Sequence, residues 1–276
     1  MAADLASALP AEVHVLHVHE APITASMYGP EYLERQGIET LEGASALVER
    51  TAAGLRARGV TASGSVRMEG GVTAEQIVAA AVEDRADLLV MGALGASRFQ
   101  ELLVGGVAHA VVQLAPQPVL VVPRRGRRGD LRRLVLGADG SAGAARAAVL
   151  TSELAARLGA VVLVVHASDG SAASEPDAIA AAAAEAVGHD HVAAVRVRVA
   201  GQGGAADALR AEAMEFGAGV LVVGRRGRTE LQRLLLGGVS ERLLHIAPCP
   251  LLVVPTAPPV PPSKGRVPAM GPDLSA

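Results

Sequence analysis

The stretch that decides the fold is GVLVVGRRGRTELQRLLLGGVSERLLHIAPCPLLVVP at residues 219–255, because the chain carries it twice. Residues 87–123 read DLLVMGALGASRFQELLVGGVAHAVVQLAPQPVLVVP and align with it without a gap, 132 residues upstream. Further towards the N-terminus, DLASALPAEVHVLHVHE (4–20) aligns with ELAARLGAVVLVVHASD (153–169) at an offset of 149 residues. The chain is therefore a tandem repeat, and its first copy is longer in the middle by 17 residues, the difference between the offsets.

Short β-branched runs alternate with helical stretches in each copy, which predicts a parallel sheet covered by helices. In the second copy the pattern predicts strands at 131–139, 160–167, 192–199, 219–224 and 250–255. Hydrophobic residues make up 50% of the chain and aromatic residues 1%. The core must be packed from Ala, Val and Leu, which suits strands buried on both faces.

The two copies differ at two places. The first is predicted to hold a long helix at 29–58, where the second has the shorter, Ala-rich EPDAIAAAAAEAVG at 175–188. The second copy's first strand and loop, LRRLVLGADGSAGAARAAVL (131–150), would align with positions before Met1. We expect a truncated or misassigned start, since the chain begins partway along a helix; a natural four-strand variant is the alternative. A doubly wound sheet places this strand centrally, so its loss would leave a gap.

These boundaries predict an N-terminal domain at 1–123, a linker at 124–130, a C-terminal domain at 131–255 and a Pro-rich, disordered tail at 256–276. The linker, RRGRRGD, carries four arginines, which we interpret as solvated rather than as an RNA-binding patch.

The charge balance excludes several classes of partner. A formal net charge of −3 and a pI near 6.2 give no basic footprint for nucleic acid or an anionic membrane. No apolar run approaches the roughly 18 to 20 residues of a membrane span, and no secretory leader is recognisable, so a cytoplasmic protein is expected. The single cysteine, Cys249, is interpreted as a core residue.

Helix capping explains part of the repeated glycine segment. Gly224 ends a strand, Thr229 is a suitable N-cap, Gly237 is expected as a left-handed residue after a short helix, and Ser240 is expected to cap the next helix. Capping leaves Gly227 unexplained.

Gly238 is also extra, and glycine is costly where no special backbone angle or close approach requires it. The spacing therefore suggests a ligand lying on the backbone at the carboxyl end of a central strand, where amide groups favour an anion such as phosphate. Arg225, Arg226 and Arg228 either contact that phosphate or are simply solvated.

A second half of a nucleotide site is expected from neighbouring strand ends. Asp139 ends the strand LVLGAD, where its carboxylate could accept hydrogen bonds from a ribose or an adenine edge, and Ala167 ends the next strand. An Asx-turn before Gly140 and Ser141 is the structural alternative for Asp139. The chain has no GxxxxGK[ST] segment, and no GxGxxG follows the first strand, so neither a Walker P-loop nor a dinucleotide fingerprint is present.

On these residues the chain resembles the universal stress protein family. The family pattern G-x2-G-x9-G is met by Gly224, Gly227 and Gly237, the last strand by HIAPCPLLVVP (245–255) and the first by VLGADGS (135–141). The resemblance implies an α/β fold with two flavodoxin-like or Rossmann-like doubly wound parallel sheets of strand order 3-2-1-4-5, the first lacking its first strand. It further implies a regulatory protein of the stress response that binds ATP, with or without Mg²⁺, in the C-terminal domain.

Carried over residue by residue, the resemblance implies that the adenine nucleotide contacts Asp139, Ala167, Gly224, Gly227, Gly237, Gly238, Val239 and Ser240. Gly238 departs from the family, which has Ser or Thr there, so one phosphate-binding hydroxyl is lost. The two domains are expected to pack pseudo-symmetrically, or the chain to form a homodimer.

Copy one departs further, with Gly106 and Ala108 at both hydroxyl positions and no aspartate-bearing strand. We expect it to bind nucleotide poorly or not at all and to pack against copy two. If it does bind a ligand, the contacting residues would be Val18, Gly92, Gly95 and Gly105.

Three other functions stay open at this stage. A slow ATPase or nucleotidyl-transfer enzyme would need a positioned metal and base, and only Asp139 and Glu230 lie near the glycine turn, so a non-enzymatic protein is favoured. A structural or dimerisation module without ligand is a serious competitor because of Gly238. A metal site on HVLHVH (14–19) has two histidines on one strand face, His17 and His19, and lacks a third ligand.

Overall fold

A computed structural model describes residues 1–19, 40–68, 72–94, 105–124, 129–168, 176–199, 204–227 and 236–256 of the chain. In the N-terminal copy the elements are α1 (Ala2–Ala8), β1 (Val13–His19), α3 (Leu41–Arg56), β2 (Ala62–Met68), α4 (Thr73–Glu83), β3 (Leu89–Gly92), α5 (Gly106–Leu114) and β4 (Val119–Val122). In the C-terminal copy they are β5 (Asp130–Ala138), α6 (Ala142–Leu158), β6 (Val161–Ser168), α7 (Pro176–Val187), β7 (Val192–Val199), α8 (Gly204–Phe216), β8 (Ala218–Gly224), α9 (Gly238–Ile246) and β9 (Leu251–Val254).

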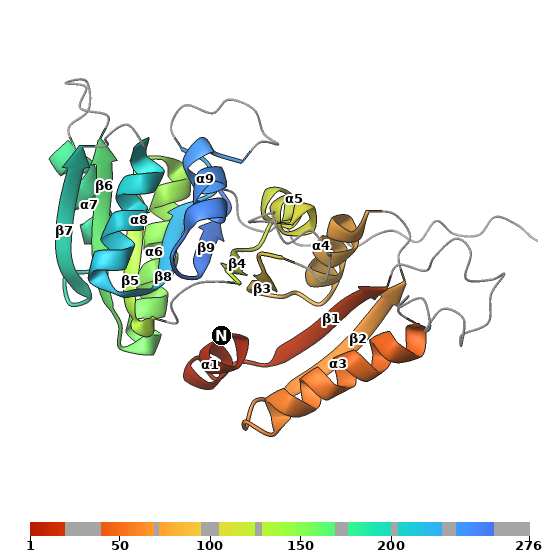
Figure 1. Ribbon diagram of the computed structural model, residues 1–276. Helices are drawn as coiled ribbons and strands as arrows, with labels where there is room; N and C mark the ends of the chain where they lie inside the picture. Colours follow the sequence, from red (N-terminus) through yellow and green to blue (C-terminus); the bar gives the residue numbers. More distant parts are fainter. Residues whose placement is uncertain are drawn as a thin grey trace, which may run out of the picture.

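The C-terminal copy forms a doubly wound sheet. Its strands lie in the order β7-β6-β5-β8-β9, all parallel, which confirms the predicted order 3-2-1-4-5 (Figure 1). The five predicted strands are all present, with ends that differ by one residue or less. Asp130, assigned to the linker from the sequence, begins β5.

The core of this domain lies on both faces of the sheet. Leu134 and Leu136 of β5 pack on the side covered by α6 and α7, whereas Val135 packs on the side covered by α8 and α9. All three are fully buried, as expected for a central parallel strand. Cys249 is a core residue as predicted, and burial raises the pKa of its thiol to about 12.

The N-terminal copy is split in two. β1 and β2 form a separate two-stranded parallel sheet, while β3 and β4 join the large sheet (Figure 1). Among the described residues nothing takes the place that β5 occupies in the C-terminal copy. In the described part of copy one the sheet therefore has a break between β1 and β3, into which no other described strand has moved.

The long helix predicted at 29–58 is shorter. α3 begins at Leu41, after Thr40, whose hydroxyl accepts a hydrogen bond from the amide of Gly43 at 3.1 Å. Residues 20–39 lie outside the described part of the chain. A threonine cap inside the apolar pattern sets the start, which periodicity alone does not reveal.

The two copies join through one antiparallel strand pair. β4 pairs with β9 so that Leu120 faces Leu252, its own equivalent in the repeat, and both are buried. Val119 faces Val253, and Val121 faces Leu251, with the same two-fold relation. The domains therefore pack pseudo-symmetrically, as an isologous interface does.

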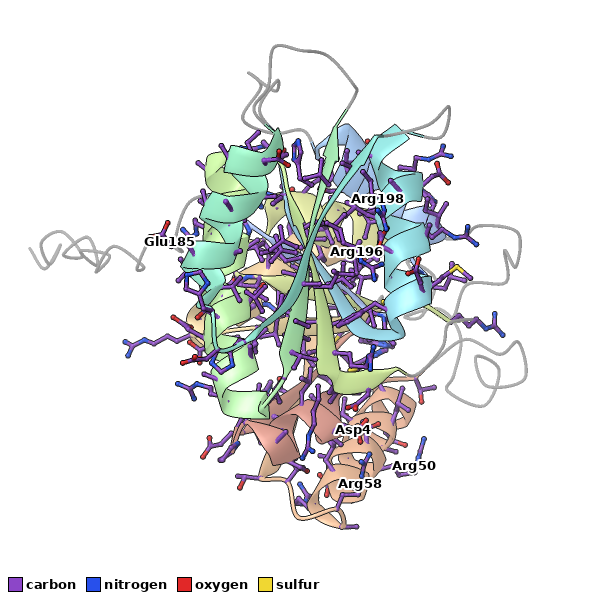
Figure 2. All side chains as sticks on the ribbon, turned by 90° about the vertical axis from the view of Figure 1, so that its left-hand side faces the viewer. Asp4, Arg50, Arg58, Glu185, Arg196 and Arg198 are labelled. Carbon is purple, nitrogen blue, oxygen red and sulfur yellow. The ribbon has the colours of Figure 1, made fainter. Side chains whose placement is uncertain are left out.

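The outer strand β7 carries a charged cluster. Arg196 and Arg198 point to α8, where both guanidinium groups contact the carboxylate of Glu212, which is 4% exposed (Figure 2). Arg196 also donates to Glu215 at 2.9 Å. The hydrogen bond to Glu212, with that to Glu215, raises the pKa of Arg196. This cluster fastens α8 to the edge of the sheet.

The packing at Gly224 generates a prediction for the fold. A methyl group on Gly224 would lie 2.5 Å from the carbonyl carbon of Gly143 in α6, whereas one on its counterpart Gly92 meets nothing closer than the oxygen of Leu94 at 3.3 Å. We expect Gly224→Ala to lower the free energy of unfolding by about 1 to 3 kcal/mol, because backbone must move apart. Gly92→Ala, the matched control, should change it far less in denaturant titrations; equal losses would contradict this packing.

Candidate functional site

Three strand ends meet at the carboxyl edge of the C-terminal sheet. Ala138 of β5 is level with His166 of β6, so the next residues, Asp139 and Ala167, lie side by side. Gly224 ends β8, the neighbour of β5 on its other side. The structure thus brings together the two halves of the predicted site, at the position where ligands bind in open α/β sheets.

Asp139 connects the first loop to the glycine turn. Its Oδ1 accepts a hydrogen bond from the amide of Ser141 at 2.9 Å, so the Asx-turn that was the structural alternative does form. Its Oδ2 lies against Gly227, where an added methyl group would be 2.7 Å away. The carboxylate is half-buried, and one of its oxygens, Oδ1, accepts a hydrogen bond within the protein.

Different contacts explain why glycine is needed at the individual positions of the turn. Gly224 is required by the backbone of α6, and Gly227 by the carboxylate of Asp139. At Gly237 an added methyl group would lie 3.1 Å from the carbonyl oxygen of Arg225. Gly238 is different, because a methyl group there meets no atom within 4 Å. Protein packing explains three of the four glycines, and space remains at the fourth.

Two capping predictions were wrong. Gly237 has φ −67° and ψ 141°, an extended conformation, and it is itself the N-cap of α9 rather than a left-handed residue. Ser240 does not cap this helix: it lies in the first turn, buried, and its hydroxyl donates to the carbonyl oxygen of Gly224 at 2.7 Å. In the first copy Gly105 is likewise an extended N-cap. The prediction rested on a short preceding helix at 229–236, of which residues 229–235 lie outside the described part.

Arg225 has neither of the two predicted roles. Its guanidinium donates to the carbonyl oxygens of Gln113 at 3.0 Å and Ala115 at 2.7 Å, at the C-terminal end of α5 in the other domain. A cation there is favourable for the helix dipole. Burial, with the charge of Arg226 second, lowers the pKa of this guanidinium. The counterpart of Arg225 in copy one is Ala93, whose side chain cannot donate an equivalent hydrogen bond to the C-terminal domain.

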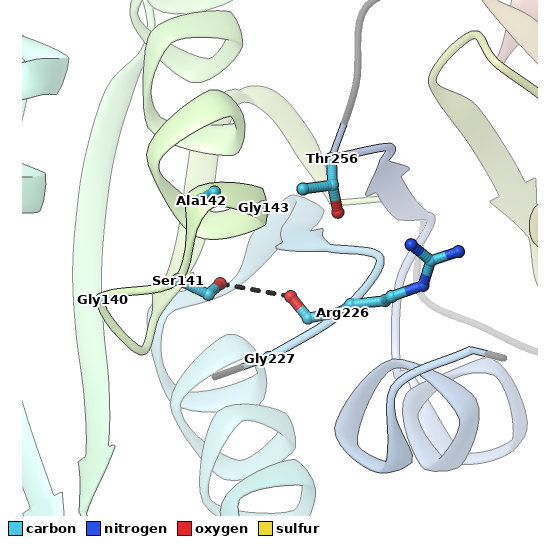
Figure 3. A pocket seen from close by; sticks show the side chains of 7 residues that line it. All are labelled: Gly140, Ser141, Ala142, Gly143, Arg226, Gly227 and Thr256. Atoms are coloured by element: carbon cyan, nitrogen blue, oxygen red, sulfur yellow. Dashed lines mark hydrogen bonds between the residues drawn. The ribbon is translucent and has the colours of Figure 1, made fainter. Parts of the chain in front are cut away.

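A cavity of about 360 Å³ opens beside the turn (Figure 3). The loop before α6 and the first turn of this helix, the residues after β8, and a residue two positions after β9 line it: Gly140, Ser141, Ala142, Gly143, Arg226, Gly227 and Thr256. The hydroxyl of Ser141 joins two of these walls by donating to the carbonyl oxygen of Arg226 at 3.2 Å.

Thr256 is a site residue that the sequence reasoning missed. Its Oγ1 is buried and has no hydrogen-bond partner among the described residues. A buried hydroxyl without a partner is costly, so a ligand atom in the cavity would satisfy it. The sequence signal was a threonine directly after the last strand of the sheet, at a position that we had assigned to the disordered tail.

In copy one the corresponding residues are dispersed. Val18 lies in β1, whereas Gly92 and Gly105 belong to the part that joins the large sheet, and Gly95 is outside the described residues. His14 contacts the hydroxyls of Ser63 at 3.0 Å and Ser65 at 2.7 Å. The described residues contain no group of three or more His, Cys, Asp or Glu that could hold a metal ion.

A doubly wound parallel sheet with a glycine turn and a helix N-terminus at its carboxyl edge belongs to the class of open α/β folds, in which ligands bind at this edge. The sequence model of the universal stress protein family matches residues 1–123 and again 130–255, so the chain belongs to this family as a tandem two-domain member. No helix in the described part of the chain is long and apolar enough to cross a membrane.

Known proteins agree with this assignment. The chain is 33% identical over 136 residues to universal stress protein YxiE of Bacillus subtilis, covering 44% of this chain and 85% of the relative. A universal stress protein structure from Archaeoglobus fulgidus superimposes with a TM-score of 0.70 at 21% identity, covering 92% of this chain and 91% of that one. A functionally unknown protein from Pseudomonas aeruginosa gives a TM-score of 0.59 at 19% identity, with 90% and 94% covered. These structures share the fold.

The contact of Arg225 with α5 predicts a stability change. Arg225→Ala removes two hydrogen bonds from a charged donor and should lower the free energy of unfolding by about 2 kcal/mol in urea titrations. Arg225→Lys should recover little of this, since both hydrogen bonds come from Nη1 and the shorter lysine side chain brings its ammonium group less far towards α5. The exposed Arg210 of α8 gives a control, Arg210→Ala, expected to stay within about 0.5 kcal/mol. Equal losses in both alanine variants would show that Arg225 does not join the domains.

Proposed function

We propose that the C-terminal domain binds an adenine nucleotide, ATP, and that the protein is a nucleotide-dependent regulator of the stress response rather than an enzyme. The observation that carries this proposal is the cavity of about 360 Å³ between the first turn of α6, the glycine turn and Thr256. Its volume lies in the range of small-molecule sites, roughly 300 to 1,000 Å³. Membership of the universal stress protein family supports it.

The walls of the cavity suit phosphate. α6 has 17 residues, and the amides of Ala142 and Gly143 belong to its first turn, where backbone donors have no acceptor within the helix. The positive end of the helix dipole adds to this preference for an anion. Arg226 lines the cavity with its backbone carbonyl towards Ser141, and the hydroxyl of Thr256 can donate to a phosphate oxygen (Figure 3).

The nucleoside would lie along the strand ends. Asp139 and Ala167 are adjacent there, and a carboxylate that already accepts one amide hydrogen bond keeps lone pairs for a ribose hydroxyl. The hydroxyl of Ser240 already donates to Gly224, so we assign it to holding α9 in place beside the exposed Val239. Gly224, Gly227 and Gly237 would shape the turn, and Gly238 would offer backbone only.

A magnesium ion would arrive with the nucleotide. The described residues hold no cluster of three or more acidic or histidine ligands, and Mg²⁺ is commonly bound through substrate phosphates with one or two carboxylates. Asp139 is the carboxylate placed for such a contact. The ion would neutralise phosphate charge; positioning of the phosphates would fall to α6 and the glycine turn.

A ligand-free structural module is the second candidate, and one observation favours it. Asp139 and Ser240 both have partners within the protein, and the strand pair β4–β9 builds a pseudo-symmetric assembly without any ligand. The two candidates differ in a measurable way. Mass spectrometry of small molecules released from protein purified without added nucleotide should yield ATP or ADP if the first is correct.

The open space at Gly238 gives a test of gain of function. Gly238→Ser restores the hydroxyl that the family has at this position, in a site where the added atoms meet nothing within 4 Å. We expect ATP affinity to rise about tenfold, equivalent to about 1.4 kcal/mol, in isothermal titration calorimetry. Gly106→Ser, at the equivalent open position of copy one, is the matched control and should leave the affinity unchanged. A rise in both variants, or in neither, would contradict the assignment to copy two.

The hydroxyl of Thr256 allows a test in which ATP affinity should be lost. Thr256→Val keeps the shape of the side chain and removes the hydroxyl, so the thermal stability of the free protein should stay equal or rise. ATP affinity should fall about tenfold if the hydroxyl contacts a phosphate. Asp139→Ala should abolish most binding, although it also removes the amide contact of the Asx-turn. Unchanged affinity in Thr256→Val, measured alongside its thermal unfolding, would remove Thr256 from the site.

A further inference from the structure

A ring of contacts begins and ends on helix α5 and passes through the glycine turn of the other domain. The guanidinium of Arg225 donates to two carbonyl oxygens at the end of α5, at 3.0 and 2.7 Å. The carbonyl oxygen of Arg225 accepts from the amide of Gly237 at 2.9 Å, and that of Gly237 accepts from the amide of Glu241 at 2.8 Å. The carboxylate of Glu241 lies 3.6 Å from Nε2 of His109, which again belongs to α5. One helix of the N-terminal domain therefore holds both the turn after β8 and the first turn of α9.

The backbone part of this ring is present in both copies, and its closure through an arginine is not. In copy one the amide of Gly105 donates to the carbonyl oxygen of Ala93 at 2.7 Å, and the amide of His109 donates to that of Gly105 at 3.1 Å. These two bonds repeat those of copy two and belong to the fold of each domain. Ala93 has no side chain that could extend to the C-terminal domain. Arg225 thus adds a connection that copy two alone makes among the described residues.

The carbonyl oxygens that Arg225 contacts suit a charged donor. Gln113 lies in the last turn of α5, and Ala115 is the residue that caps it. The last carbonyl groups of a helix have no acceptor role within the helix itself, so the guanidinium supplies donors that they otherwise lack. Hydrogen bonds from a charged donor are shorter and stronger than neutral ones, and the side chain of Arg225 is partly buried. The position of the turn is therefore tied firmly to α5.

The next two residues of the same turn border the nucleotide cavity. The carbonyl oxygen of Arg226 accepts a hydrogen bond from the hydroxyl of Ser141 at 3.2 Å (Figure 3). Gly227 lies against the carboxylate of Asp139. Consecutive Cα atoms of a chain are fixed about 3.8 Å apart, so a movement of Arg226 or Gly227 that changes the cavity must also move Arg225. The cavity and α5 are thus connected through three consecutive residues.

We propose that α5 regulates the C-terminal nucleotide site, and that Arg225 is the positioning residue through which the helix and the site act on each other. This inference rests on the proposed function. The guanidinium is engaged by α5, so Arg225 acts on a nucleotide through the backbone of the turn. A turn that α5 holds in the binding position raises the affinity for ATP. By linkage, bound ATP stabilises the contact with α5 by the same factor.

The first test compares ATP affinities of the full chain by isothermal titration calorimetry. Arg225→Ala should raise the Kd for ATP about fivefold, the lower end of the usual range for coupled sites. The measurement is made at a temperature where circular dichroism shows both chains folded. The matched control is Arg242→Ala, because this arginine of α9 donates to Asp207 of α8, at 2.9 Å, within its own domain. Its Kd should stay within about twofold of the native value. An unchanged Kd in Arg225→Ala, or equal losses in both variants, would overturn the proposal.

The reciprocal test measures the effect of ATP on α5 by hydrogen exchange. In the native chain, ATP should slow exchange in the last turn of α5 about fivefold, for example at the amide of Ala115, which donates to Val111 at 2.8 Å. In Arg225→Ala the same amides should not respond to ATP. No nucleotide contact is expected in this domain, so a purely structural role of Arg225 predicts no response in either chain. Bound ATP without a change in α5 of the native chain would therefore contradict the coupling.

Exchange in the free chain separates the two proposals. Without nucleotide, the amide of Gly237 should exchange about fivefold faster in Arg225→Ala than in the native chain, because its acceptor loses the support of α5. Equal rates would show that the turn does not depend on α5, whether or not ATP binds. If the native chain binds no ATP, the titration overturns the proposed function and this inference with it; if it binds ATP and α5 does not respond, the inference alone falls.

A second variant covers the case in which Arg225→Ala does not fold. His109→Ala removes the other contact between α5 and the site, and it leaves both hydrogen bonds of Arg225 in place. We expect a smaller rise in the Kd for ATP, about twofold, and a weaker response of α5 to ATP in hydrogen exchange. A native response of α5 in this variant, together with an unchanged Kd, would exclude the contact with Glu241 from the ring, and the exchange data on the native chain would then decide the proposal.

Discussion

The antiparallel pairing of β4 with β9 is the contact on which the rest of the structure depends. It joins the half-sheet of one copy to the complete sheet of the other and makes a single seven-stranded sheet. Because Leu120 faces its own equivalent Leu252, the interface has the form that two identical subunits would make. The same relation places His109 of α5 opposite its equivalent Glu241 of α9, at 3.6 Å.

The symmetry of this interface is not kept at the glycine turns. Arg225 extends from the turn of copy two to the end of α5, while copy one has Ala93 at that position. Arg225, the residue directly after β8, therefore links the glycine turn to the N-terminal domain by hydrogen bonds. Any ligand in the C-terminal cavity is held by a turn that α5 supports from the other side, so the N-terminal copy has a structural part in the site even without binding nucleotide.

The strand order and the place of the candidate site could be predicted from the sequence, because both follow from repetition and from the direction of parallel strands. Asp139 and Ala167 had to meet once each was assigned to a strand end. The reasons for the glycines could not be predicted, since the close approach of Gly224 to Gly143 is a contact between distant segments. The partners of Arg225 lie 110 and 112 residues away in the sequence, and the place of Thr256 at the cavity depends on how the start of α6 lies beside the segment after β9.

The same glycine contacts bear on the first copy. In copy two, Gly224 is required by the N-terminal turn of α6, which follows the central strand. Gly92 keeps the residue, although the described part of copy one places no helix turn against it. Val90, two residues before it in β3, has an apolar side chain that is 37% exposed. The sequence of copy one thus keeps, at Val90 and Gly92, the residue types that β8 has beside β5 in copy two.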